Sequence, residues 1–183
     1  MPSLNPVVRM DVIKPVLASS VELANDRVAP GPEAFEAAVQ SIYPSLVRRL
    51  VMVVGNEHDA EDIAQDAYLA AFRAWARFDG TDVRAWLYTI ALRLAFNQLR
   101  RRKRWLDRVW RVEPEAWTDR ADPDLWAALA TLDPQTRAAI LLNTLDGYTQ
   151  GEIAAMFELP EGTIASRISR GRATLRSVLS GEP

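Results

Sequence analysis

Five consecutive cations at residues 100–104 (Arg-Arg-Arg-Lys-Arg) form the densest charge in this 183-residue sequence. They lie in a longer basic segment, residues 84–111, which holds nine Lys or Arg residues and one acid. Contacts between such cations and DNA phosphates release condensed counterions, so this run favours nucleic acid binding with a strong salt dependence. Cations also complement the dipole at a helix C-terminus, but five in a row exceed what that requires. Three aromatic residues of the same segment could stack unpaired bases, although a core position is favoured for each singly: Trp86, Tyr88 and Phe96.

A second candidate site lies at residues 149–170, where the pattern is typical of a helix-turn-helix. Thr149 and Glu152 have the spacing of a capping box, which begins a short helix. A turn at residues 158–160 then precedes a last helix at residues 161–179. Polar side chains on the outer face of this pair could contact base edges or phosphates in a major groove. An ordinary helical hairpin is the alternative, but the capping box and the basic outer face favour DNA binding.

The residues that carry other kinds of chemistry are few. The acidic segment 57–66 holds five carboxylates and no Lys or Arg, and His58 lies within it. A metal site there is the alternative to the favoured interpretation, which is a solvated helix start whose acids interact with the helix dipole. The absence of cysteine excludes disulfides, thiolate metal sites and a cysteine nucleophile. A single histidine argues against triad chemistry. We predict no cofactor and no metal.

The elements that position these residues are all predicted to be helices. Apolar residues recur at spacings of three and four through residues 33–77, and no segment alternates with the period of a strand. Asp82 is a suitable N-cap for a helix at residues 83–104. Two Asp-Pro pairs, at 122–123 and 133–134, place an N-cap before a proline at the first helical position. The sequence therefore predicts an all-α fold.

The order of these segments predicts two small helical domains joined by a short linker, the C-terminal one containing the helix-turn-helix. Residues 1–33 carry five of the eleven prolines and are interpreted as a flexible tail, with a short partner-binding helix as the alternative. The first domain is expected at residues 34–104, the linker at 105–121 and the second domain at 122–180. No apolar segment has the length of a membrane span, so we expect no membrane insertion and a cytoplasmic location.

The net charge of −2 would by itself argue against a nucleic acid partner, but it conceals an alternation of charged blocks. The acidic segment 57–66 precedes the basic segment 84–111. Residues 112–135 then hold six acids and one Arg, and the last helix holds four Arg and one Glu. Basic surfaces for DNA and acidic surfaces for another partner are therefore compatible with a total near zero.

The charged segments together resemble a known family. Residues 59–79, 84–104 and 132–176 are similar, in this order and spacing, to segments of bacterial RNA polymerase sigma factors of the extracytoplasmic-function (ECF) type. These are two-domain initiation factors that contain only sigma regions two and four, and the resemblance covers residues 34–179. It implies a protein that binds core RNA polymerase and directs promoter recognition and transcription initiation. It also implies that the chain is no enzyme, because polymerase performs the chemistry.

The resemblance assigns three sets of site residues. Those matching the polymerase-binding motif, with two aromatic residues supporting its helix, are Glu61, Asp62, Gln65, Asp66, Phe72 and Trp75. Those matching the segment that captures the melted minus-ten element are Trp86, Arg93, Asn97, Arg100, Arg101, Arg102, Lys103 and Arg104. Those assigned to the helix-turn-helix that reads the minus-thirty-five element as duplex are Thr149, Gln150, Glu161, Thr163, Ser166, Arg167 and Arg170.

Two positions depart from the family pattern. Ala165 stands where the family usually has Lys, which removes one phosphate contact. Glu158 stands at a turn position usually held by Gly, and a left-handed backbone there would cost about 1 kcal/mol. The family also implies an anti-sigma factor that clamps regions two and four together, and a stress or envelope signal as the inducer. The acidic linker at 112–124 is expected to thread polymerase channels that normally hold nucleic acid.

Two other functions stay open from the residues alone. A response regulator or dimeric repressor would use the helix-turn-helix but leaves residues 59–104 unexplained. An enzyme would use the clustered carboxylates with His58, and nothing else in the sequence supports it. Start-site selection by core RNA polymerase discriminates a sigma factor from both.

Overall fold

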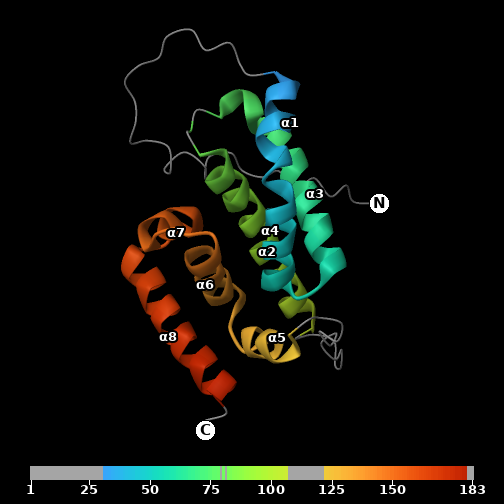
Figure 1. Ribbon diagram of the computed structural model, residues 1–183. Helices are drawn as coiled ribbons and strands as arrows, with labels where there is room; N and C mark the ends of the chain where they lie inside the picture. Colours follow the sequence, from blue (N-terminus) through green and yellow to red (C-terminus); the bar gives the residue numbers. More distant parts are fainter. Residues whose placement is uncertain (1–30, 79, 81, 107–121, 181–183) are drawn as a thin grey trace.

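The computed structural model describes residues 31–78, 80, 82–106 and 122–180. Every regular element in these residues is a helix, which confirms the all-α prediction. Most of the predicted tail and of the predicted linker lies outside the described residues. Figure 1 shows the arrangement of the elements, which are α1 (Pro32–Gln40), α2 (Tyr43–Val54), α3 (Glu57–Ala74), the 3-10 helix η3 (Trp75–Arg77), α4 (Val83–Leu106), α5 (Pro123–Ala130), α6 (Pro134–Leu145), α7 (Gln150–Phe157) and α8 (Glu161–Ser180).

Helices α2, α3 and α4 pack on one another as a three-helix bundle, and α1 lies against α2 and α4. Gly55, at φ 87°, ends α2 in the left-handed conformation that glycine adopts without strain. The side chain of Asn56 begins α3, because it accepts a hydrogen bond from the N–H of Asp59 at 2.8 Å. The inner face of α3 carries small side chains that are fully buried, which lets the helix pack close to α2 and α4. These side chains are Ala60, Ala64, Ala67 and Ala71.

The second half of the chain begins its helices with the predicted caps. Asp122 accepts a hydrogen bond from the N–H of Leu125 at 3.0 Å and begins α5. Asp133 accepts from two N–H groups of α6, both at 3.1 Å. Thr149 and Glu152 form the capping box at the start of α7, with both of its hydrogen bonds present. These side chains fix where each helix starts.

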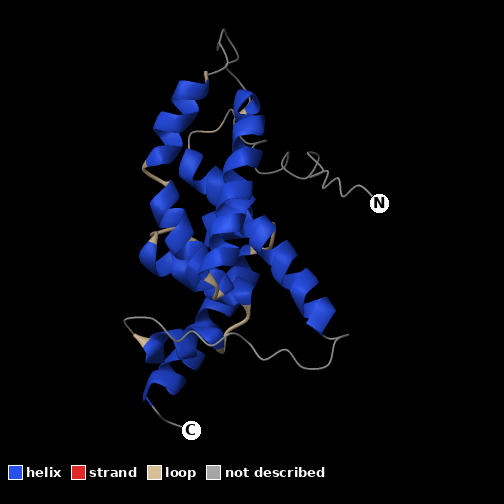
Figure 2. Ribbon diagram, turned by 90° about the vertical axis from the view of Figure 1, so that its right-hand side faces the viewer, coloured by secondary structure: helices blue, strands red, loops and turns tan. Residues whose placement is uncertain are grey.

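Helices α6 and α8 cross at Gly171. An added Cβ at this position would lie 2.6 Å from both Ile140 Cδ1 and Thr136 Cγ2, so no larger residue fits without a shift of α6. Gly171 is therefore a packing residue, a role the sequence alone did not reveal. Figure 2 shows the helical elements of both halves from a second direction.

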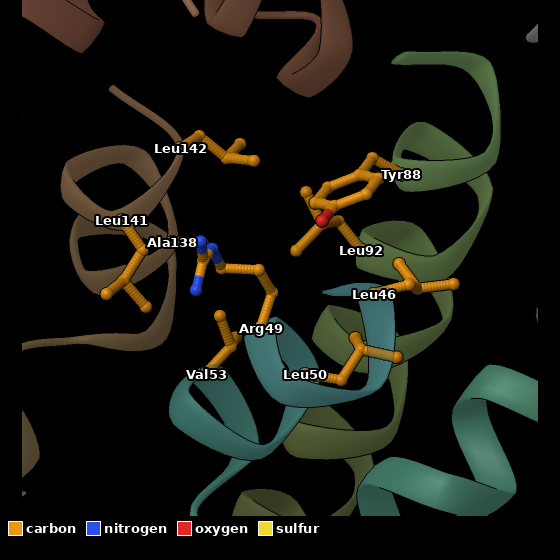
Figure 3. Close-up of a pocket in the computed structure, with 9 residues that line it drawn as sticks. All are labelled: Leu46, Arg49, Leu50, Val53, Tyr88, Leu92, Ala138, Leu141 and Leu142. Atoms are coloured by element: carbon orange, nitrogen blue, oxygen red, sulfur yellow. The ribbon is translucent and has the colours of Figure 1, made fainter. Parts of the chain in front are cut away.

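The two halves also pack against each other, which the two-domain prediction did not anticipate. Helix α6 lies on α2, and α7 lies on α4 (Figure 1). Buried residues of both halves consequently form one continuous hydrophobic core. Figure 3 shows a small pocket at this boundary, lined from α2, α4 and α6 by Leu46, Arg49, Leu50, Val53, Tyr88, Leu92, Ala138, Leu141 and Leu142.

No single helix in the described ranges is long and apolar enough to cross a membrane. Helices α1 and α2 meet such a test only as a pair bent by 58°, on length and composition alone. The large apolar side chains of this pair are largely buried in the core.

Candidate nucleic acid and protein interfaces

The outer face of α3 carries a continuous exposed stripe. Its first part is polar and acidic, and its last part is apolar, because Leu69 and Phe72 keep 47% and 42% of their surface exposed. Exposed apolar side chains beside a row of carboxylates are typical of a protein-binding surface. Sequence reasoning missed Leu69, which continues the helical spacing of the residues before it. We call this surface the docking stripe; it consists of Glu61, Asp62, Gln65, Asp66, Leu69 and Phe72.

Trp75 lies beneath the docking stripe rather than on it. Its side chain is 7% exposed and stacks on Phe78, with ring centroids 5.3 Å apart and an interplanar angle of 6°. The ring of Phe35 meets Trp75 edge-on at 5.3 Å and Phe72 edge-on at 5.4 Å. Trp75 therefore packs in the core beneath the end of α3. Phe72, which is part of the docking stripe, also contacts the core through Phe35.

Trp86, expected from the family to face the minus-ten element, is half-buried in the same aromatic cluster. The centroid of its ring lies 4.8 Å from that of Phe78 and 6.1 Å from that of Trp75. Asn97 is exposed further along α4, and its Oδ1 accepts a hydrogen bond from Arg100 Nη2 at 2.6 Å. Asn97 therefore orients the first cation of the basic run.

The five cations of the basic run at the end of α4 differ in their exposure to solvent. Arg102 is half-buried, and its Nη1 donates to Oδ2 of Asp59 in α3 at 3.0 Å. Gln98 Nε2 donates to the other oxygen of the same carboxylate at 3.2 Å. Arg102 thus ties α4 to α3. The remaining members of the run are exposed: Arg100, Arg101, Lys103 and Arg104.

Arg93, the other cation assigned to the minus-ten segment, points to the opposite half of the chain. It forms an ion pair with Glu158, and burial lowers the pKa of its guanidinium. Glu158 ends α7 with a left-handed backbone, at φ 56° and ψ 42°. Among the residues described, it is the only non-glycine with positive φ, so the strain anticipated from the sequence is present.

Helix α8 turns its polar residues away from the core. Ile164 and Ile168 are buried, while Ser166 and Arg170 are exposed. The Oγ of Ser166 donates to the carbonyl of Thr163 at 2.9 Å, and Arg170 Nε donates to the carbonyl of Ser166 at 3.2 Å. The helix therefore presents one polar, basic face to solvent, as the helix-turn-helix pattern predicts.

Arg167 is the exception on α8, because Asp133 holds it. Its Nη1 donates to Asp133 Oδ1 at 3.2 Å, and the same oxygen caps α6 through the N–H groups of Gln135 and Thr136. Burial alone would raise the pKa of Asp133, but the hydrogen bonds from Thr136 and the charge of Arg167 outweigh it and hold that pKa below its ordinary value. Contact between Arg167 and DNA would compete with this pair.

The remaining helix-turn-helix residues lie at the starts of α7 and α8. Thr149 is exposed, and its N–H and Oγ1 both donate to Glu152 Oε2, at 2.7 Å and 2.8 Å. These hydrogen bonds lower the pKa of Glu152. Gln150 is half-buried and Glu161 is exposed in the first turn of α8. The capping box thus fixes the start of the short helix that precedes the turn.

Comparison with known proteins decides between the functions left open by the sequence. The family model for Sigma-70 region 2 matches residues 38–105, and that for Sigma-70, region 4 matches residues 123–175. The ECF RNA polymerase sigma factor SigM of Mycobacterium tuberculosis is 30% identical over 167 residues, which cover 88% of this chain and 85% of SigM. This chain belongs to the ECF family of RNA polymerase sigma factors.

Further relatives of this ECF sigma factor support the same fold. The ECF sigma factor SigE of Mycolicibacterium smegmatis is 36% identical over 69% of this chain, which spans about half of SigE, 54% of its length. The solved structure of the sigma factor RpoE in complex with the anti-sigma factor NepR, from Bartonella quintana, matches with TM-score 0.70 and 28% identity, over 82% of this chain and 99% of that one. CnrH, in complex with the cytosolic domain of CnrY, matches with TM-score 0.62 and 27% identity, over 84% and 92%.

The structure brings together some assigned residues of this ECF sigma factor and separates others. The four polar residues assigned to polymerase binding share one face of α3. Those assigned to the minus-ten element are divided, because Trp86, Arg93 and Arg102 are engaged within the fold while the others are exposed. Helices α3 and α8 lie at opposite sides of the molecule (Figure 1), so one chain can present different surfaces to different partners.

Proposed function

We propose that this chain binds core RNA polymerase through the docking stripe and directs it to promoters through α4 and α8. The observation that carries this proposal is the distribution of exposed charge. Carboxylates gather on α3, cations at the end of α4 and a basic face on α8, each on an element of its own. Domain boundaries at 34–104 and 122–180 would place the contacts of α3 and α4 in one unit and those of α8 in the other.

The docking stripe suits a basic protein partner. Its exposed carboxylates would pair with cations of polymerase, which steers the encounter and sets orientation. Leu69 and Phe72 would fill the centre of the contact, where apolar burial supplies most of the affinity. Polymerase then performs all bond formation, and this chain acts as a transcription initiation factor.

The exposed end of α4 suits a single DNA strand. Arg100, Arg101, Lys103 and Arg104 would track its phosphates, and Asn97 with the accessible part of Trp86 would meet unstacked bases. Arg93 could join them only after it parts from Glu158. Polymerase would hold the strand open while α4 captures it.

The polar face of α8 suits duplex DNA. A recognition helix enters the major groove with its first turns, where Thr163 and Ser166 lie, while Arg167 and Arg170 reach phosphates or guanine edges. Ala165 is half-buried on this helix and supplies no charge, so one phosphate contact is absent. The preceding helix α7, begun by Thr149 and Gln150, would lie along the backbone.

An anti-sigma factor is the proposed regulator of this chain. The structure of RpoE that resembles this fold contains the anti-sigma factor NepR, which supports a partner of the same kind here. Such control would serve a stress or envelope signal and would place the chain in the cytoplasm. The acidic segment 112–124 would occupy polymerase channels that otherwise hold nucleic acid.

Run-off transcription with core RNA polymerase and a promoter library tests this function. The full chain should co-purify with core and should enrich promoters that share two elements, one read as duplex and one melted. Core enzyme without the chain is the control for background initiation. Failure to co-purify with core, together with start sites no different from the control, would overturn the proposal.

A further inference from the structure

Asp146, at the end of α6, is the centre of an ion-pair cluster between the two halves. Its side chain has no exposed surface. Arg49 Nε of α2 lies 2.6 Å from its Oδ2, and Arg84 Nη2 of α4 lies 2.6 Å from its Oδ1. Arg49 and Arg84 keep 17% and 40% of their side chains exposed, so solvent screens the cations in part, but loss of both would leave the buried carboxylate without a compensating charge. Two cations of region two therefore hold one carboxylate of region four. We call these three residues the Asp146 cluster.

A second polar connection joins α6 to the end of α2. Arg137 Nη1 donates to the carbonyl of Val53 at 3.0 Å, and Arg137 Nη2 donates to the carbonyl of Leu132 at 2.9 Å. Burial lowers the pKa of this guanidinium to about 10. The carbonyl of Val53 thus gains a donor from the other half. The boundary is fixed by directional contacts as well as by apolar packing.

A third connection joins the helix-turn-helix to α4 itself. Phe157 of α7 meets Phe96 of α4 edge-on, with ring centroids 5.3 Å apart. The next residue, Glu158, pairs with Arg93, which lies one helical turn before Phe96. Region four therefore covers an aromatic ring and a cation on the helix assigned to the melted DNA strand.

Glu158 has a left-handed backbone conformation, which is unusual for a residue with a side chain. A glycine would adopt the left-handed conformation there without strain, yet the chain carries a glutamate. The carboxylate of that glutamate reaches Arg93 across the boundary. The pair explains why a strained residue type occupies the end of α7, since no glycine could make it.

We propose that region four inhibits the minus-ten surface of its own chain. The carboxylate of Glu158 occupies Arg93 in place of a DNA phosphate, and the Asp146 cluster holds the closed arrangement. DNA capture by α4 then requires the two halves to separate, which exposes Arg93 and Phe96 to a single strand. This inference rests on the proposed function of α4.

Binding of single-stranded DNA by the full chain, without polymerase, tests the inference. The probe is a labelled oligonucleotide that carries the minus-ten sequence selected by transcription, and fluorescence anisotropy gives its Kd. Glu158→Gly removes the carboxylate and the backbone strain, and we expect about fivefold tighter binding from the loss of one partly exposed ion pair. Glu158→Gln removes the charge alone and should act in the same direction.

Glu36→Gln is the matched control. Glu36 is exposed on α1, outside the surfaces assigned to DNA and to polymerase, and its substitution removes the same single negative charge. It should leave the Kd for single-stranded DNA nearly unchanged. A gain shared equally by Glu158→Gly and Glu36→Gln would reflect net charge only and would overturn the inference.

The separation of the halves can be measured directly, because the chain contains no cysteine. Ala76→Cys in the 3-10 helix η3 and Ala173→Cys on α8 place spin labels at two exposed positions. The pair should report one narrow distance population in the unmodified background and an additional, longer population with Glu158→Gly. Asp146→Asn should lengthen it further; if that variant does not fold, Glu158→Gly decides alone.

The outcomes separate this inference from the proposed function. An unchanged Kd and an unchanged distance for Glu158→Gly overturn the inference, even when the wild-type chain selects start sites with core polymerase. A Kd and a distance that respond to Glu158→Gly support the closed arrangement. Loss of start-site selection in the wild-type chain would instead count against the function assigned to α4.

Discussion

Arg102 of α4 donates from Nη1 to the carboxylate of Asp59 in α3 at 3.0 Å. One cation of the basic run therefore holds two helices together. Its neighbours along the run, Arg101 and Lys103, are exposed. Cations that look equivalent in the sequence should therefore respond differently to substitution. The pair also anchors the start of the helix that carries the docking stripe.

The first prediction concerns this division. Replacement of Arg100, Arg101 and Lys103 by Ala should lower the slope of log K against log salt for single-stranded DNA by about 2, since each phosphate contact contributes about 0.7. Arg102→Ala should change that slope little and should lower the free energy of unfolding by about 0.5 kcal/mol, because its pair is partly exposed. Salt titrations and urea unfolding check the two effects. An equal loss of slope from Arg102→Ala alone would contradict the division.

The second prediction concerns the docking stripe. Charge reversal of Asp62 and Asp66 to Lys should weaken binding to core polymerase at least about tenfold, because like charges would then face a basic partner. Binding of duplex promoter DNA by the same full chain should persist. Reversal of Glu33 and Glu36, both exposed on α1, is the matched control and should leave core binding unaltered. Surface-immobilised core gives the affinities; equal losses from both double variants would refute a specific stripe.

The third prediction concerns the crossing of α6 and α8. Gly171→Ala should lower the free energy of unfolding by about 1–3 kcal/mol, because the new Cβ would meet Ile140 and Thr136 at 2.6 Å. Gly162→Ala is the control, since nothing lies within 4 Å of its Cβ position, and it should be neutral or slightly stabilising. Urea unfolding of the two variants measures the difference. Equal stabilities would show that α8 can shift without cost.

The fourth prediction concerns acid stability. Burial alone would raise the pKa of Asp133, yet hydrogen bonds from Thr136 and the charge of Arg167 hold it below 3.8, its ordinary value. The folded state then binds fewer protons than the unfolded state, so Asp133 contributes stability above its unfolded pKa that is lost as the pH falls through the folded one. Asp133→Asn keeps a capping oxygen but cannot titrate. Its urea midpoint should therefore fall less between about pH 5 and pH 2 than that of the wild type.

A contrary result for Asp133→Asn is equally clear. A midpoint that falls as steeply as in the wild-type chain would assign the acid sensitivity to other carboxylates. Glu152→Gln is a useful companion, because Glu152 also has a lowered pKa, caused by hydrogen bonds from Thr149. The urea midpoint of Glu152→Gln should also fall less with decreasing pH than that of the wild type.

Helix starts could be predicted because their determinants are local. A capping side chain and the N–H groups it satisfies lie within three residues, as at Asp133 and in the Thr149–Glu152 box. Apolar spacing likewise indicated the helices at residues 33–77, which include α3. The family resemblance added the order of the functional segments, which spacing alone does not provide.

The contacts between the halves could not be predicted, because periodicity shows which face is buried but not what covers it. Arg49 and Asp146 lie 97 positions apart, and neither has a neighbour in sequence that signals a buried pair. Charge counting likewise treats Arg93 and Arg100 alike, although one is paired across the boundary and the other is exposed. Cations could be located from the sequence, but their partners could not.

The alanine face of α3 implies an asymmetric tolerance to sequence drift. Ala60, Ala64, Ala67 and Ala71 set how closely this helix approaches its neighbours, and a single added methyl group there would push the whole element outward. The exposed polar side chains of the same helix can change without moving the helix. Relatives should therefore keep small residues at these four positions, because any larger side chain would shift the docking stripe relative to the bundle.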